Sequence, residues 1–124
     1  MNKEELLSLL ETLKLSKEEF VILSSSSLVL RNILETANDL DIAVTEKGLT
    51  ELKQNYELKQ KENGWYIVNE KIECVLDTKE EWKIEKYGEY YLESLTKYFE
   101  YLKNSTREKD KIKYDIVKRE LEKM

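Results

Sequence analysis

The sequence predicts an α+β protein in which a mixed β-sheet is flanked by helices, with further helices at the C-terminus. Three patterns support this class: leucines at helical spacing near the N-terminus, short apolar runs typical of buried strands, and two amphipathic segments that close the chain. With 124 residues, 40% of them hydrophobic, we expect a single domain over residues 1–124.

Residues 3–14 place their leucines on one side of a helix and predict an amphipathic helix. Two apolar runs, 20–23 and 40–44, are typical of buried strands. The stretch between them, 24–38, begins with four serines, and its apolar residues are spaced for a helix. The expected local order is therefore strand, serine turn, helix and strand.

A short surface helix is expected over residues 48–55. Residues 56–60 and 65–69 flank an Asn-Gly pair, which is a strong signal for a β-hairpin. Residues 71–77 alternate in polarity and predict a further strand, with Ile72 and Cys74 on one face and Glu73 on the other.

Residues 82–92 are expected to form a strand or an irregular segment, and residues 94–104 a helix. Ser105 followed by Glu108 is typical of a capping box, which predicts a last helix ending near Lys123. Basic residues outnumber acidic ones there; a solvated helix face is the favoured interpretation, and contact with a triphosphate or RNA is the alternative.

Composition excludes several classes of protein. The absence of histidine excludes the Ser-His-Asp triad, the Cys-His dyad and histidine-ligated metal sites, and the lone Cys74 excludes an intrachain disulfide. A formal net charge of −5 argues against a general nucleic-acid binder. No apolar run approaches the ~18 residues of a membrane span, and glutamates interrupt the N-terminal leucines where a signal peptide would be apolar. We therefore expect a cytoplasmic protein without a membrane partner.

Asp39 and Asp41 form the most specific local pattern. Strand side chains alternate, so both carboxylates are expected on one face while Leu40 and Ile42 point into the core. Two neighbouring carboxylates repel each other, and Mg²⁺ is the natural partner of such oxygen ligands. The alternative is a pair of solvated aspartates at the edge of a strand.

A run of four serines follows the first predicted strand and opens a helix. Backbone N–H groups at a helix start, together with hydroxyl donors, favour an anion such as phosphate. Ordinary helix capping is the alternative, but it requires only one serine. The run consists of Ser24, Ser25, Ser26 and Ser27.

Residues 21–44, VILSSSSLVLRNILETANDLDIAV, resemble the opening motif of the nucleotidyltransferase superfamily (the DNA polymerase β-like fold), particularly its small bacterial and phage members. In that motif a glycine-rich turn and a helix precede an Asp-hydrophobic-Asp strand. Ser25 falls where the family's second glycine sits, fourteen residues before Asp39. The segment STREKDKIKYDIV also resembles the family's Arg-x-Lys-Asp box, here Arg107, Lys109 and Asp110.

The resemblance implies a nucleotidyltransferase-like sheet and Mg²⁺-dependent transfer of a nucleoside monophosphate from an NTP to a hydroxyl acceptor. It implies that Asp39 and Asp41 hold Mg²⁺ (or Mn²⁺) on the phosphates, and that a third carboxylate helps to activate the acceptor. Glu73 is the best match for this third group, and Asp77 is its competitor. The acceptor is open (tRNA, a small molecule or a protein), and a homodimer or a protein partner would complete its site.

The serines depart from the family pattern, because serine adopts a positive φ less readily than glycine. An alternative function is therefore a catalytically weak or inactive member of the fold that acts as a protein-binding module. Such a module would be antitoxin-like, as in toxin–antitoxin pairs, or a partner protein encoded by a phage or mobile element.

Overall fold

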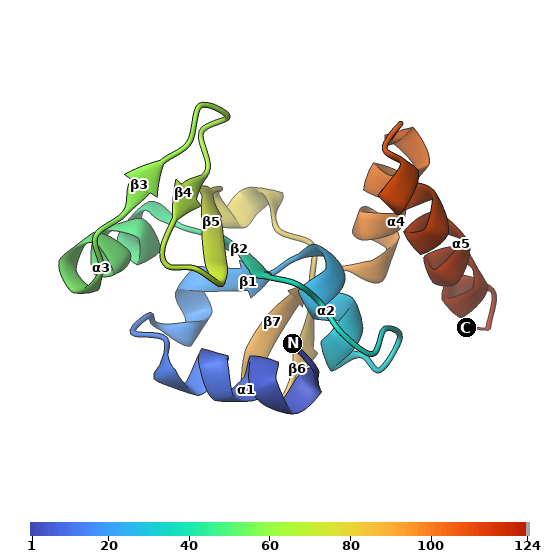
Figure 1. The fold of residues 1–124 in the computed structure, drawn as a ribbon, viewed down its shortest axis with the longest axis horizontal. Helices are drawn as coiled ribbons and strands as arrows, with labels where there is room; N and C mark the ends of the chain where they lie inside the picture. The colour runs from blue at the N-terminus through green and yellow to red at the C-terminus, as the bar shows by residue number, and fades with distance from the viewer. Residues whose placement is uncertain (124) are drawn as a thin grey trace.

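The computed structural model describes residues 1–123, including every side chain among them except that of Glu81. Within these residues the chain forms a seven-stranded mixed sheet and five α-helices, so the predicted α+β class with two C-terminal helices is confirmed (Figure 1). The helices are α1 (Lys3–Thr12), α2 (Ser24–Leu30), α3 (Glu46–Asn55), α4 (Leu95–Asn104) and α5 (Glu108–Glu122). The strands are β1 (Phe20–Ile22), β2 (Leu40–Val44), β3 (Lys59–Gln60), β4 (Tyr66–Ile67), β5 (Ile72–Leu76), β6 (Ile84–Tyr87) and β7 (Tyr90–Glu93).

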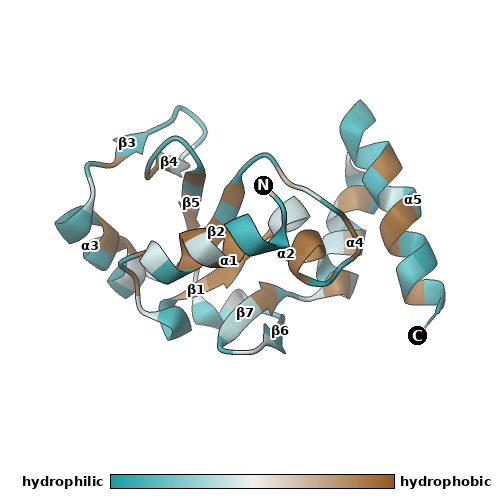
Figure 2. Ribbon diagram, turned by 60° about the horizontal axis from the view of Figure 1, so that its bottom comes forward, coloured by the Kyte–Doolittle hydropathy of each residue, from teal (hydrophilic) through white to brown (hydrophobic). Residues whose placement is uncertain are grey.

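The sheet has the order β3-β4-β5-β2-β1-β7-β6, which places β2 at its centre. β2 runs parallel to β5 and antiparallel to β1, while β1 runs parallel to β7. Figure 2 shows hydrophobic residues on the central strands β1 and β2 and a hydrophilic edge at β3. This distribution follows from burial, because the side chains of the central strands are mostly buried and those of the edge strand are exposed to solvent.

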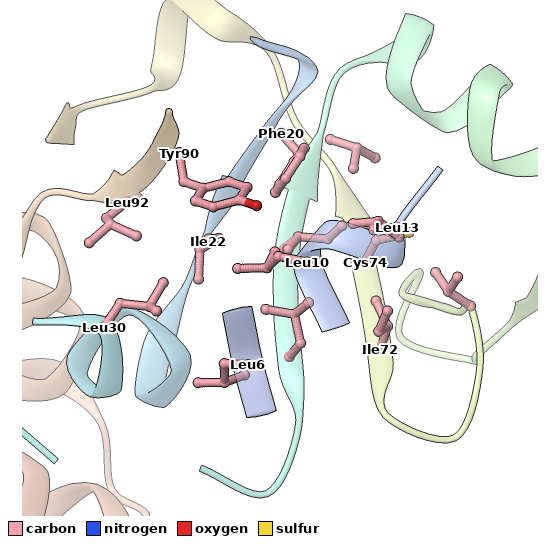
Figure 3. Close-up of a cluster of buried hydrophobic side chains, with 14 of the residues drawn as sticks. Leu6, Leu10, Leu13, Phe20, Ile22, Leu30, Ile72, Cys74, Tyr90 and Leu92 are labelled. Carbon is pink, nitrogen blue, oxygen red and sulfur yellow. The ribbon is translucent and has the colours of Figure 1, made fainter. Parts of the chain in front are cut away.

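Helix α1 covers one face of the sheet. Its leucines pack against β1 and β5 (Figure 3), and Leu6 and Leu10 are 0% and 3% exposed. A capping box between Asn2 and Glu5 begins this helix. Cys74 faces the same core, where burial raises the pKa of its thiol to about 11. The cysteine therefore has a packing role, as its strand position predicted.

Helix α2 is much shorter than the helix predicted over residues 24–38. Asn32 adopts a φ of 64°, its N–H bonds to the carbonyl of Val29, and the N–H of Ile33 bonds to that of Leu28. These two bonds form a Schellman motif, which satisfies the last carbonyls and ends the helix at Leu30. Asparagine tolerates the left-handed conformation better than most residues. The helix expected over residues 24–38 was therefore too long, because it did not take Asn32 as a helix end.

Two hairpins complete the sheet edges. β3 and β4 pair on either side of a turn with Gly64 at a φ of 88°, so the predicted hairpin is confirmed with shorter strands. The ambiguous segment 82–92 falls largely in a second hairpin, β6 and β7, which turns at Gly88 with a φ of 58°. Glycine is suited to both turns because it has no Cβ to clash at positive φ.

Helices α4 and α5 pack together at one end of the molecule (Figure 1), around Tyr98, Leu102 and Val117. The predicted capping box at Ser105 and Glu108 is wrong, because Arg107 is the N-cap and makes no side-chain cap bond. The Ser105 hydroxyl instead donates to buried Asp110 at 2.7 Å. A buried carboxylate needs such donors more than the exposed start of the helix does.

Candidate functional site

Asp41 and Glu73 lie opposite each other on the adjacent parallel strands β2 and β5. Their neighbours Leu40 and Ile42 point into the core and are 0% exposed, so both carboxylates occupy the other face of the sheet. Both also line one cavity of about 480 Å³. The structure thus brings Asp41 and Glu73 together at one cavity.

Asp39 and Asp77 have different surroundings. Asp39 is exposed just before β2 and lines a second cavity, of about 200 Å³, together with Asp41. Asp77 follows the last residue of β5, whereas Glu73 lies near the start of that strand. The Asp77 side chain accepts the N–H of Thr78, and Asp77 lines a separate cavity together with Glu19. Glu73, rather than Asp77, is therefore the carboxylate beside Asp41.

The position of Asp41 is electrostatically unfavourable for its charged form. Burial raises the pKa of Asp41, and the charges of Glu73 and Asp39 raise it further, while Lys113 and Lys61 lower it. A cation placed between these carboxylates would relieve their repulsion, and their hard oxygens suit Mg²⁺ or Mn²⁺. The charge and the oxygen ligands of these carboxylates therefore fit a divalent ion.

The carboxylates are not assembled as a closed metal centre. No group of three or more Cys, Asp or Glu side chains in residues 1–123 is arranged to hold a metal ion. Lys61, from the connection between β3 and β4, reaches Glu73 with its Nζ 2.9 Å from Oε1. The ammonium group thus supplies the positive charge beside Glu73.

The four serines divide into two pairs. Ser24 and Ser25 line the smaller cavity, next to Asp39 and Asp41. Ser26 and Ser27 are buried, and their hydroxyls donate to the carbonyls of Asp39 and Ser24 at 2.6 and 2.7 Å. The hydroxyls of Ser26 and Ser27 therefore hold the backbone of the turn, because buried donors need partners.

Ser24 carries the strained backbone of this turn, with a φ of 53°. The sequence pattern aligned Ser25 with a family glycine, whereas the left-handed residue is the one before it. Serine in this region costs roughly 1–2 kcal/mol relative to an ordinary conformation. The surrounding bonds of the turn hold Ser24 in this conformation.

Glu93, at the end of β7, is a site residue that sequence reasoning missed. Its Oε1 accepts the N–H of Ser24 at 3.0 Å, and it lines the larger cavity with Asp41 and Glu73. Burial raises the pKa of Glu93, while the Ser24 N–H, Lys97 and Arg31 lower it. Alternation with buried Tyr90 and Leu92 could have placed Glu93 on this face, but the segment expected as a strand or an irregular stretch ended at residue 92.

Aromatic and basic residues also line the two cavities. Helix α4 contributes Tyr98 and Tyr101, whose rings stack with centroids 6.0 Å apart. Trp65 from the β3–β4 hairpin lines both cavities. Three cations from the start of α5 line the smaller cavity: Arg107, Lys109 and Lys113. Carboxylates of the sheet and cations from the start of α5 therefore line these cavities together, with Lys61 in the larger cavity and Asp110 in the smaller one.

Comparison with protein-family models, curated proteins and solved structures finds no match to this chain. Among residues 1–123, no helix has the length and apolar character that crossing a membrane requires.

Proposed function

We propose that this protein has a nucleotidyltransferase-like fold and transfers a nucleoside monophosphate from an NTP to a hydroxyl acceptor, with Mg²⁺ or Mn²⁺ as cofactor. The observation that carries the proposal is the paired carboxylates of Asp41 and Glu73 on adjacent parallel strands. Both carboxylates line the larger cavity with Arg107, and Asp41 also lines the smaller cavity with Arg107 and Lys113. A metal–triphosphate complex has charge of both signs and complements cavities lined by carboxylates and cations.

In this proposal Asp39, Asp41 and Glu73 hold the divalent cation. When bound, the cation would neutralise charge on the phosphates and on the leaving group. The acceptor oxygen bonds to the α-phosphorus, and the bond from that phosphorus to the oxygen bridging to the β-phosphate breaks. Pyrophosphate leaves with the electrons of that bond, and Glu73 accepts the proton of the acceptor hydroxyl.

The test is incubation of the protein with each α-labelled NTP, Mg²⁺ or Mn²⁺, and host lysate, tRNA or protein as acceptor. Asp41→Asn should abolish transfer of label. Asp77→Asn is the matched control, because it makes the same chemical change at the other end of β5, beside a separate hollow. Transfer that survives Asp41→Asn, or that is absent from the wild type with every NTP and acceptor, contradicts the proposal.

The ion pair between Lys61 and Glu73 favours a second candidate function, a protein-binding module without catalysis. An internal ammonium group that neutralises Glu73 lets the site persist without a metal. This function predicts that no NTP with Mg²⁺ raises the melting temperature, and that the protein forms a complex of fixed stoichiometry with a protein partner. A nucleotide-dependent rise in melting temperature that Asp41→Asn abolishes excludes it.

A further inference from the structure

Three donors of the serine turn are already bonded within the fold. The N–H of Ser24 is bonded to the Glu93 carboxylate, and the hydroxyls of Ser26 and Ser27 are bonded to carbonyl oxygens. The Glu93 carboxylate beside this turn would also repel an anion. The side-chain donors of the turn that line the smaller cavity are the hydroxyls of Ser24 and Ser25, and cations around the same cavity can supply further phosphate contacts.

Arg107 is held in place by a buried carboxylate. Asp110 is 2% exposed and accepts the Ser105 hydroxyl at 2.7 Å. Its Oδ2 also lies 3.3 Å from Nε of Arg107, an ion pair in which the arginine side chain stays 52% exposed. Ser105 in turn accepts the backbone N–H of Arg107 at 3.2 Å. These contacts engage Nε, and no other side chain described in residues 1–123 bonds to the two terminal nitrogens of the guanidinium, which can therefore donate to a ligand.

Arg107 lines both cavities, as Asp41 does. Lys109 and Lys113 line the smaller cavity beside it, and Lys113 is partly buried and interacts electrostatically with Asp41. These three cations line a polar cavity of about 200 Å³ together with the carboxylates of Asp39, Asp41 and Asp110. With Mg²⁺ on the carboxylates, the three cations would suit a compact polyanion. Arg107 differs from an ordinary exposed cation in two ways. It has a buried partner, Asp110, and it lines a cavity that also contains carboxylates.

We propose that Arg107, Lys109 and Lys113 form a polyphosphate-binding wall, and that Asp110 is the residue that positions Arg107. The triphosphate of the nucleotide would thus be held mainly by the start of α5 rather than by the serine turn. The inference deepens the proposed function, and rests on it for the identity of the ligand as an NTP. The wall itself can be tested without any transfer reaction.

The probe is inorganic tripolyphosphate with Mg²⁺, titrated calorimetrically into the wild type and four variants. Arg107→Gln should weaken binding about ten-fold or more, the size of one charge-assisted hydrogen bond. Lys111→Gln is the matched control, because it removes the same charge from the same helix at an exposed residue paired with Glu108. Asp110→Asn should weaken binding less than Arg107→Gln, and Ser25→Ala should leave it nearly unchanged.

Equal weakening by Arg107→Gln and Lys111→Gln would reduce the effect to net charge and overturn the proposal. So would a loss confined to Ser25→Ala, or a wild type that does not bind tripolyphosphate. Tripolyphosphate carries no nucleoside to transfer, so this titration measures phosphate binding alone. Failure of the polyphosphate-binding wall can therefore be distinguished from failure of the proposed transfer reaction. Binding that depends on Arg107, in a protein that transfers no label, would retain the wall and reject the reaction.

Discussion

The N–H of Ser24 and the carboxylate of Glu93 join two distant parts of the chain at 3.0 Å, the turn after β1 and the end of β7. The strands β1 and β7 are parallel neighbours, so both ends arrive at the same edge of the sheet. The bond satisfies the backbone of a residue in the left-handed region. It also places a third carboxylate in the hollow with Asp41 and Glu73.

The first prediction concerns this bond. Glu93→Gln keeps an oxygen that can accept from Ser24, and its neutral amide avoids burying a charge, so we expect stability at pH 7 close to that of the wild type. Glu93→Ala removes the acceptor and should lower the free energy of unfolding by about 1–3 kcal/mol. Urea unfolding of both variants measures the difference, and equal stability of the two would contradict the role given to the bond.

A second prediction separates the two serines at the start of the turn. Ser24→Gly relieves a left-handed serine, whereas Ser25→Gly only adds backbone freedom within α2. We expect the Ser24 variant to be the more stable of the two by about 1 kcal/mol. Thermal or urea unfolding gives the comparison. If Ser25→Gly were instead the more stable variant, Ser25 would be the position that favours glycine, as the alignment with the family motif predicted.

The third prediction follows from the raised pKa of Asp41. Because the folded pKa lies above the unfolded one, ionised Asp41 destabilises the fold, and this cost is lost as the pH falls below both values. Without metal, Asp41→Asn should raise the free energy of unfolding at pH 7 by on the order of 1 kcal/mol. The gain should shrink as the pH falls through the folded pKa toward 3.8, the ordinary pKa of an aspartate side chain.

Urea unfolding with a chelator, at pH 7 and at successively lower pH, tests this sign. A variant that is less stable than the wild type at pH 7 would show that the carboxylate is a structural partner of Lys113 or Lys61. Asp77→Asn serves as the control, since its carboxylate accepts an N–H at the separate end of β5.

The fourth prediction concerns Lys61, whose ammonium group pairs with Glu73. Removing this charge in Lys61→Gln should tighten Mn²⁺ binding by about five-fold, since a partly exposed ion pair contributes up to about 1 kcal/mol. Lys59→Gln on neighbouring β3 is the matched control, because it also removes one charge from the hairpin. Titration with Mn²⁺, followed by electron paramagnetic resonance, gives both affinities. Equal affinities of the two variants would show that Lys61 does not compete with a cation.

Local pattern was enough to place most of the elements. The leucines of α1, the run in β2 and the Asn-Gly turn each carry their signal within about ten residues, so no distant partner is needed to read them. Alternation along β2 and β5 also predicted that Asp41 and Glu73 would leave the core. The helix after the serines was overestimated because a Schellman motif with asparagine resembles helix in composition.

Only the tertiary structure decided which of these residues meet. Sequence spacing left Glu73 and Asp77 as alternatives, and the register of two parallel strands selected Glu73 as the neighbour of Asp41. The pairing of β1 with β7 brought Glu93 to the serine turn, and the packing of α4 and α5 brought Arg107 to the cavities that Asp41 lines. Such contacts join residues far apart in the chain, so burial and register decide them, whereas the sequence alone determines only which face each side chain occupies.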